Sequence, residues 1–293
     1  MDLLILGGTG QLGRHIVAAA LDSRHSVTCL ARGTNPAPGG AQLVRADRDL
    51  PHPYREVEGT RWDAVVELAS APGRVREATS SITADHWLYV SSISVYALHD
   101  QPCRTEDAEL VPPLNADRLS GPQDYGPAKV ACEQIVQQSA SAWTVVRPGL
   151  IGGAGDDTGR TGYYPWRFAH PTGPSVVVPD AARRRHDRCE GPRRLAGAVP
   201  GATPHRDLPC HRPDDVAHRR DRRGSASGRP GDGSWLRSWW RGGGASTAGL
   251  TFRPLEDTLA DALAFEESRG GPVGAGLSEE TEHRVRQSCQ PSP

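Results

Sequence analysis

A tyrosine and a lysine, Tyr125 and Lys129, stand four residues apart in a stretch whose pattern predicts a helix. On a helix, residues four apart share one face and lie one turn from each other. A nearby ammonium favours the phenolate, and so lowers the pKa of a tyrosine from its usual value of about 10. Such a tyrosine can exchange a proton with a substrate hydroxyl or carbonyl near neutral pH. Ser92, at an expected strand end, can hydrogen-bond the same substrate oxygen.

Proton exchange of this kind completes a hydride transfer, in which a nicotinamide cofactor carries the hydride and the protein manages the proton. A Tyr-x-x-x-Lys pair also occurs by chance, as an exposed pair on a helix. Two features favour the catalytic interpretation here. Lys129 is the only lysine of the chain, and a Ser-Ser-Ile-Ser-Val-Tyr segment precedes the pair.

The stretch that would bind such a cofactor is residues 3–17, which read Leu-Leu-Ile-Leu-Gly-Gly-Thr-Gly-Gln-Leu-Gly-Arg-His-Ile-Val. An apolar strand stops at Gly7, and the pattern then becomes helical. Gly7 permits a sharp turn, Gly10 lets a pyrophosphate approach the backbone, and Gly13 allows the helix to pack closely on the strand. The helix N-terminus would face the phosphates. The alternative is a glycine-rich turn in some other α/β protein.

Further strands must form a sheet that brings the glycine turn and the Tyr-Lys pair to one edge. The expected strands are Leu3–Leu6, Ser26–Leu30, Gln42–Arg45, Trp62–Leu68, His86–Tyr96 and Thr144–Val146, and a helix opens at Tyr125 and continues through Ile135. Strands that alternate with helices predict an α/β fold with a doubly wound parallel sheet of the Rossmann type. Arg32 follows the second strand, where an arginine can accept the 2′-phosphate of NADP; its alternative is a solvated loop arginine.

This order of motifs, over residues 1 to about 180, resembles the extended short-chain dehydrogenase/reductase superfamily, and within it the NAD-dependent epimerase/dehydratase-like reductases. The resemblance implies Ser92, Tyr125 and Lys129 as the catalytic set, with Lys129 also touching the nicotinamide ribose. It implies NAD or NADP as the cofactor, and Arg32 favours NADP. The cofactor site expected on this basis comprises Gly7, Thr9, Gly10, Gln11, Leu12, Gly13, Arg32, Asp47, Lys129 and Pro148.

Two points qualify that resemblance. Asp47 matches an aspartate that lies near the adenine in the superfamily, but an aspartate at a strand end also caps turns. Many extended members carry an Asn, on the helix before the fifth strand, that supports the lysine through water. Residues 74–84 contain no Asn. We therefore expect a different proton relay or a weaker catalytic geometry.

Composition argues against several other classes of protein. The 293 residues carry a net charge of -1, which predicts no polyanionic partner. The six cysteines form no Cys-x-x-Cys pair, so no metal is expected, and Cys29 and Cys132 are expected to be buried thiols. No apolar run is long enough for a bilayer, and no signal-like segment precedes the first strand. We expect a cytoplasmic protein that binds a small-molecule substrate, and neither nucleic acid nor a membrane.

The chain changes character at residue 181. Residues 181–244 are rich in Arg, Pro and Gly and contain no Ile, Phe, Tyr, Met, Asn, Gln or Lys. One interpretation is a basic nucleic-acid-binding arm, which the interspersed acidic residues and prolines disfavour. The other is translation out of frame. Shifted by one base, suitable codons for residues 191–196 encode Asp-Leu-Ala-Ala-Trp, as the resembled family has there, and resequencing codons 175 to 250 tests this.

The expected organisation is an NAD(P)-binding Rossmann domain at 1–180, an irregular segment at 181–244, a helix remnant at 245–270 and a disordered tail at 271–293. The region after 180 would be a small, degraded substrate region. The expected function is that of an NAD(P)-dependent oxidoreductase or epimerase acting on a small carbonyl or hydroxyl compound, such as a sugar derivative. The alternative is a non-catalytic nucleotide-binding protein or the inactive product of a frame-disrupted gene.

Overall fold

The computed structural model describes residues 1–98, 108–173, 176–177, 206–209 and 253–288. These residues fall into two compact units, and each is described by itself. The first unit contains Met1–Leu150 together with residues 206–209, and the second contains the described residues from Ile151 to 177 and from Arg253 onwards. The chain leaves the first unit after Leu150, before the boundary that the composition predicts at residue 180.

A seven-stranded parallel sheet forms the first unit, with the strands in the order β3-β2-β1-β5-β7-β8-β9. The strands are β1 Asp2–Leu6, β2 Ser26–Ala31, β3 Gln42–Arg45, β5 Ala64–Glu67, β7 Trp87–Val90, β8 Trp143–Arg147 and β9 Arg206–Pro209, and β4 Arg61–Trp62 pairs separately with β6 Thr83–Ala84. The order reverses direction at β1, as it does in Rossmann folds. The predicted doubly wound parallel sheet is confirmed.

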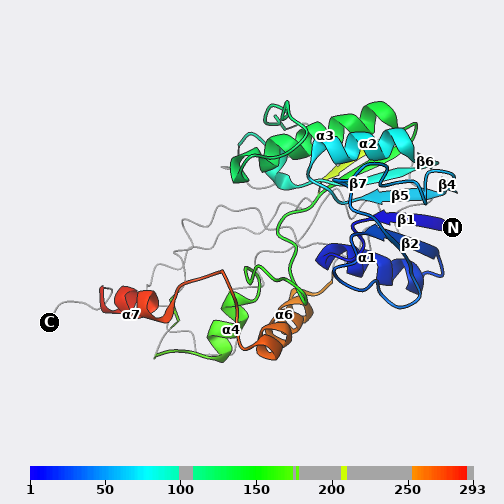
Figure 1. The fold of residues 1–293 in the computed structure, drawn as a ribbon. Coiled ribbons are helices and arrows are strands. Elements are labelled where there is room, and N and C mark those ends of the chain that lie inside the picture. The colour runs from blue at the N-terminus through cyan, green and yellow to red at the C-terminus, as the bar shows by residue number, and fades with distance from the viewer. Residues whose placement is uncertain (99–107, 174–175, 178–205, 210–252, 289–293) are drawn as a thin grey trace. The chain divides into compact units, whose positions relative to one another are not determined.

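Helices cover both faces of this sheet. They are α1 Gln11–Asp22, α2 Pro72–Ser81 and α3 Tyr125–Ser139, with short 3-10 helices η1 Ile93–Val95 and η2 Pro122–Asp124. Helix α1 lies on one face, and α2 and α3 lie together on the other (Figure 1). Alternate residues of β1 enter two cores: Leu4 and Leu6 pack with α2 and α3, and Leu3 and Ile5 pack with α1. Strands β1, β5 and β7 are buried on both faces, which explains their nearly continuous apolar sequences.

Two predicted strands are corrected by the structure. The fifth ends at Val90, because the Ser92 hydroxyl accepts the N–H of Ser94 (3.1 Å) and turns the chain into η1. A serine hydroxyl thus offers the backbone a local partner that competes with strand pairing. The fourth is interrupted at Asp63, whose carboxylate accepts the N–H of Asp2 (2.7 Å), and is divided into β4 and β5.

The second unit contains three described helices, α4 Tyr163–Ala169, α6 Leu255–Arg269 and α7 Glu279–Ser288. Helix α4 packs against α6. Helix α7 lies within the tail that the composition predicts to be disordered, so that prediction is wrong for residues 279–288. Its Glu282 is fully buried and lies 3.2 Å from Arg167 Nε and 3.0 Å from the Thr172 hydroxyl. Such tertiary contacts leave no trace in the composition.

Most of the Arg-rich segment, residues 181–244, lies outside the described residues. The described part, residues 206–209, forms β9 and pairs in parallel with β8, so it is not irregular as predicted. The out-of-frame hypothesis stays a prediction. Cys29 and Cys132 are free and buried, as expected, and the other four cysteines (Cys103, Cys189, Cys210 and Cys289) lie outside the described residues.

Across the described ranges, every helix is too short or too polar to cross a bilayer. In the same ranges, no group of His, Cys, Asp and Glu side chains is arranged to hold a metal ion.

Candidate active site

The glycine turn joins β1 to α1 at the carboxyl edge of the sheet. Gly7 has a φ of +97°, which L side chains rarely adopt. A Cβ on Gly13 would lie 2.3 Å from the carbonyl oxygen of Gly7, so only glycine lets α1 approach β1 this closely. A Cβ on Gly10 would meet the same oxygen at 3.6 Å, an ordinary contact. The protein itself therefore tolerates a side chain at Gly10, and the absence of one leaves room for a ligand to approach the backbone.

The beginning of α1 suits an anion. Gly10 is the N-cap and supplies no side-chain cap, so first-turn N–H groups remain available for a phosphate. The Gln11 Nε2 atom is buried and has no hydrogen-bond partner among the described residues. Thr9 is buried in the turn, and Leu12 packs on the core beneath α1. These features fit a dinucleotide, whose pyrophosphate the backbone from Gly10 to Gly13 would hold.

We expect Gly10→Ala and Gly13→Ala to fail in different ways. Gly13→Ala forces a Cβ onto backbone atoms, so the free energy of unfolding should fall by about 1–3 kcal/mol. Gly10→Ala meets no close atom, and should cost about 1 kcal/mol or less as a poorer N-cap while weakening cofactor binding. Urea unfolding and a cofactor titration of both variants separate the two effects. Equal loss of stability in the two variants would contradict this division.

The adenosine end of the site contains more positive charge than predicted. Arg32 is exposed directly after β2. Arg45 ends β3 beside it, and its Nε would lie 3.1 Å from a Cβ on Gly33. Sequence reasoning missed Arg45, although two adjacent predicted strands that both end near an arginine were a usable signal. The Asp47 carboxylate accepts the N–H of Asp49 (3.0 Å), which is the turn-capping alternative, and its contact with adenine stays a prediction.

The catalytic candidates lie where α3 begins. Tyr125 opens the helix and is 36% exposed, whereas Lys129, one turn later, is 3% exposed. The Lys129 ammonium lies 5.9 Å from the centroid of the Tyr125 ring. A Cβ on Gly126 would lie 2.3 Å from the carbonyl oxygen of Ser94, so glycine here lets α3 approach η1. The structure thereby brings the Tyr-Lys pair to the turn that carries Ser92.

Ser92 is nearly buried and caps η1. Its hydroxyl accepts the N–H of Ser94 and donates to the Ser94 hydroxyl, each at 3.1 Å. Because a hydroxyl proton rotates to suit its acceptor, the same group can turn to a substrate oxygen. Sequence reasoning missed Ser94 as the neighbour that holds this hydroxyl in place.

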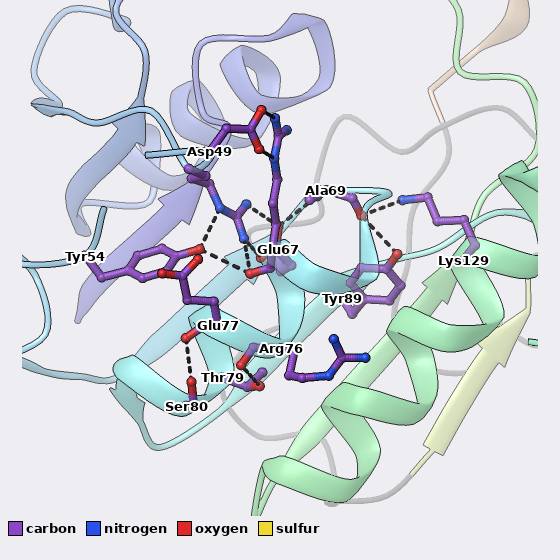
Figure 2. Close-up of polar contacts among 12 residues, drawn as sticks. Asp49, Tyr54, Glu67, Ala69, Arg76, Glu77, Thr79, Ser80, Tyr89 and Lys129 are labelled. Carbon is purple, nitrogen blue, oxygen red and sulfur yellow. Dashed lines mark hydrogen bonds and ion pairs between the residues drawn. The ribbon is translucent and has the colours of Figure 1, made fainter. Parts of the chain in front are cut away.

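Backbone carbonyls hold the Lys129 ammonium. It donates to Val90 O (2.8 Å) and lies 4.9 Å from the centroid of the Tyr89 ring. It also donates to Ala69 O at 3.2 Å (Figure 2). Burial lowers the pKa of Lys129 to about 8, and the neighbouring Glu67 carboxylate acts in the opposite direction. The two carbonyls thus hold the ammonium without the Asn that many extended members use.

At the end of β8, the backbone of Pro148 and the side chain of Arg147 make different contacts. The Pro148 carbonyl accepts the N–H of Ile93 (3.1 Å), which ties this segment to η1. The Arg147 guanidinium points into the core, where it contacts both carboxylate oxygens of Glu133 at 2.9 and 2.7 Å. Sequence reasoning missed this buried pair.

Comparison with known proteins fits this geometry. The profile of a family described as NAD(P)H-binding matches residues 7–175, more than half of the chain. The chain belongs to this NAD(P)H-binding family. It is also 30% identical over 196 residues to the 2'-dehydrokanamycin reductase of Streptomyces kanamyceticus, a match that covers 63% of the chain and 53% of the reductase. The chain thus spans about half the length of that curated relative.

Several solved structures have the same fold as this chain. The Bordetella bronchiseptica enzyme WbmG, in complex with NAD, is similar with a TM-score of 0.58 and 16% identity, over 95% of this chain and 98% of that one. A UDP-glucose 4-epimerase is similar with a TM-score of 0.55 and 15% identity, over 93% and 99%. The predicted Rossmann fold and the predicted membership of an NAD(P)-binding family are confirmed.

Proposed function

We propose that this protein is an NAD(P)-dependent oxidoreductase of the reductase or epimerase type, acting on a small carbonyl or hydroxyl compound. One observation carries the proposal: a buried ammonium, Lys129, is held by two backbone carbonyls, one helical turn from Tyr125. Burying an ammonium is costly, so its presence beside Tyr125 at the carboxyl edge of a Rossmann sheet supports a catalytic role.

Three side chains of the protein control the proton of the substrate oxygen during hydride transfer. A bound nicotinamide cofactor supplies or accepts the hydride. Tyr125 exchanges the proton of the substrate oxygen, and Lys129 stabilises the tyrosinate through its charge. The Ser92 hydroxyl donates a hydrogen bond to the same oxygen and orients it.

The substrate class follows from the relatives. The curated relative is named as a reductase of a dehydrokanamycin, and a structural neighbour is named as an epimerase of UDP-glucose. We propose a sugar-derived carbonyl or hydroxyl compound for this chain. The test offers a keto-aminoglycoside and a nucleotide sugar with each nicotinamide cofactor. Stoichiometric consumption of reduced cofactor supports a reductase, and sugar conversion without net consumption supports an epimerase. Cofactor binding without turnover of any such compound would contradict the proposal.

We propose NADP as the preferred cofactor, because Arg32 and Arg45 end adjacent strands at the expected ribose position. A charge-assisted hydrogen bond contributes about 1.5–3 kcal/mol, so Arg32→Ser should weaken NADPH binding about 10- to 100-fold. Its NADH affinity is the internal control and should change little. Fluorescence titration with both cofactors measures this, and equal weakening of the two would contradict a phosphate-binding role.

A further inference from the structure

The backbone of Ala69, just beyond the end of β5, is held on both sides. Its N–H donates to Glu67 Oε1 at 2.7 Å. Its carbonyl accepts from the Tyr89 hydroxyl at 3.0 Å and from the Lys129 ammonium at 3.2 Å (Figure 2). Ala69 therefore links a buried carboxylate to the ammonium of the candidate site.

Glu67 is itself fixed by a buried arginine. Arg48 contacts both carboxylate oxygens, at 2.9 and 2.6 Å, in the bidentate geometry that gives the strongest ion pairs. The Glu67 side chain is 0% exposed and that of Arg48 is 10% exposed. Arg48 also donates to the Tyr54 hydroxyl (2.7 Å) and to the Arg74 carbonyl (2.8 Å), so its guanidinium has little freedom to move.

The position of the Lys129 ammonium depends on the backbone carbonyls that accept its hydrogen bonds. An ammonium has three N–H donors, and Val90 O and Ala69 O take two of them. Val90 O belongs to β7 and is fixed by the sheet. Ala69 lies beyond the last β5 residue that pairs with β7, Glu67, so the paired strand does not hold its carbonyl. The Tyr89 hydroxyl holds the Ala69 carbonyl from one side, and Glu67 fixes the same residue through its N–H.

We propose that Arg48 and Glu67 are positioning residues, which fix Ala69 and through it aim the Lys129 ammonium at Tyr125. This inference rests on the proposed function of Lys129. It supplies a counterpart for the Asn missing from residues 74–84. The side chains that act on Lys129 come from three elements: Glu67 of β5, Tyr89 of β7, and Tyr125, Cys132 and Glu133 of α3.

The test uses the fact that Lys129 is the only lysine. Protein labelled with isotopic lysine gives one side-chain NMR signal, whose pH titration reports the Lys129 pKa in the protein without cofactor. Glu67→Gln keeps the shape and removes the charge, so this pKa should fall from about 8 by about one unit. The alkaline limb of kcat should move to lower pH by the same amount, with little change in KM.

Two further variants distinguish a change in the position of the Lys129 ammonium from a change in charge or a loss of folding. Arg48→Lys keeps every formal charge but removes the bidentate grip, so a shifted Lys129 signal and a lower kcat would follow from geometry. Asp49→Asn is the control, because Asp49 pairs with Arg74 and Arg118 nearer the surface and should leave both readouts unchanged. Should Glu67→Gln fail to fold, Arg48→Lys still tests the proposal.

The outcomes distinguish this inference from the proposed function. If the NMR signal and the pKa of Lys129 are the same as in the wild type in both Glu67→Gln and Arg48→Lys, the positioning role is overturned. This holds even if Lys129→Met abolishes turnover. A displaced signal in these variants, with turnover unaffected by Lys129→Met, would support the positioning of the ammonium and overturn its catalytic function.

Discussion

Tyr125→Phe should lower kcat about 10²- to 10⁴-fold while cofactor affinity stays at the wild-type value, because a positioned proton donor contributes about that much. The change removes one hydroxyl from a side chain that is 36% exposed, so the core is not disturbed. Steady-state turnover and a cofactor titration on the same preparation measure the two effects.

The melting temperature of Tyr125→Phe is the control for a loss of folding. An unchanged melting temperature with lost turnover would assign the loss to the missing proton donor. Wild-type turnover in Tyr125→Phe would remove Tyr125 from the mechanism and favour a nucleotide-binding protein without this chemistry. Loss of cofactor binding together with turnover would instead give Tyr125 a role in the cofactor site.

Glu133→Ala should lower the free energy of unfolding by about 3–5 kcal/mol, because it leaves the Arg147 guanidinium buried without its carboxylate. The two side chains are 2% and 4% exposed and share two hydrogen bonds. Denaturant unfolding monitored by tryptophan fluorescence measures the loss, and Trp143 at the start of β8 is a suitable reporter.

An exposed ion pair provides the matched control. Arg61 and Asp85 pair on the surface, with side chains 72% and 48% exposed. Asp85→Ala should therefore cost about 1 kcal/mol or less. A double variant, Glu133→Leu with Arg147→Met, should recover much of the lost stability because it leaves no unpaired buried charge. Equal costs for Glu133→Ala and Asp85→Ala would contradict a special contribution from burial.

Sequence reasoning succeeded where a motif and its partners are local. The requirement for glycine at Gly13 comes from atoms of Gly7 and Gly8 in the same turn, and the spacing of Tyr125 and Lys129 is determined by one helix. Both kinds of constraint are periodic or steric and can be read from neighbouring residues. The parallel sheet followed from the same local patterns.

The pairs that sequence reasoning missed join distant residues. Arg48 and Glu67 lie 19 residues apart and meet only because β5 ends beside the segment that follows β3. One signal was available: a glutamate at the end of an otherwise apolar strand, Ala64–Glu67, requires a buried partner. The sequence alone does not say which of its many arginines that partner is. Glu282 of α7, whose partner Thr172 lies more than a hundred residues earlier, was missed for the same reason.

The strand order has a consequence for how the chain is made. The first strand to be synthesised, β1, lies inside the sheet, so the sheet grows from its interior to both sides, and β9 is the last described strand to be added. Every residue assigned to the candidate site is encoded before codon 151. A reading-frame change in codons 181 to 244 would therefore leave the dinucleotide turn and the Tyr-Lys pair as they are. Such a frameshift would change β9 at the edge of the sheet if it preceded codon 206, whereas a frameshift before codon 7 would change every residue assigned to the candidate site.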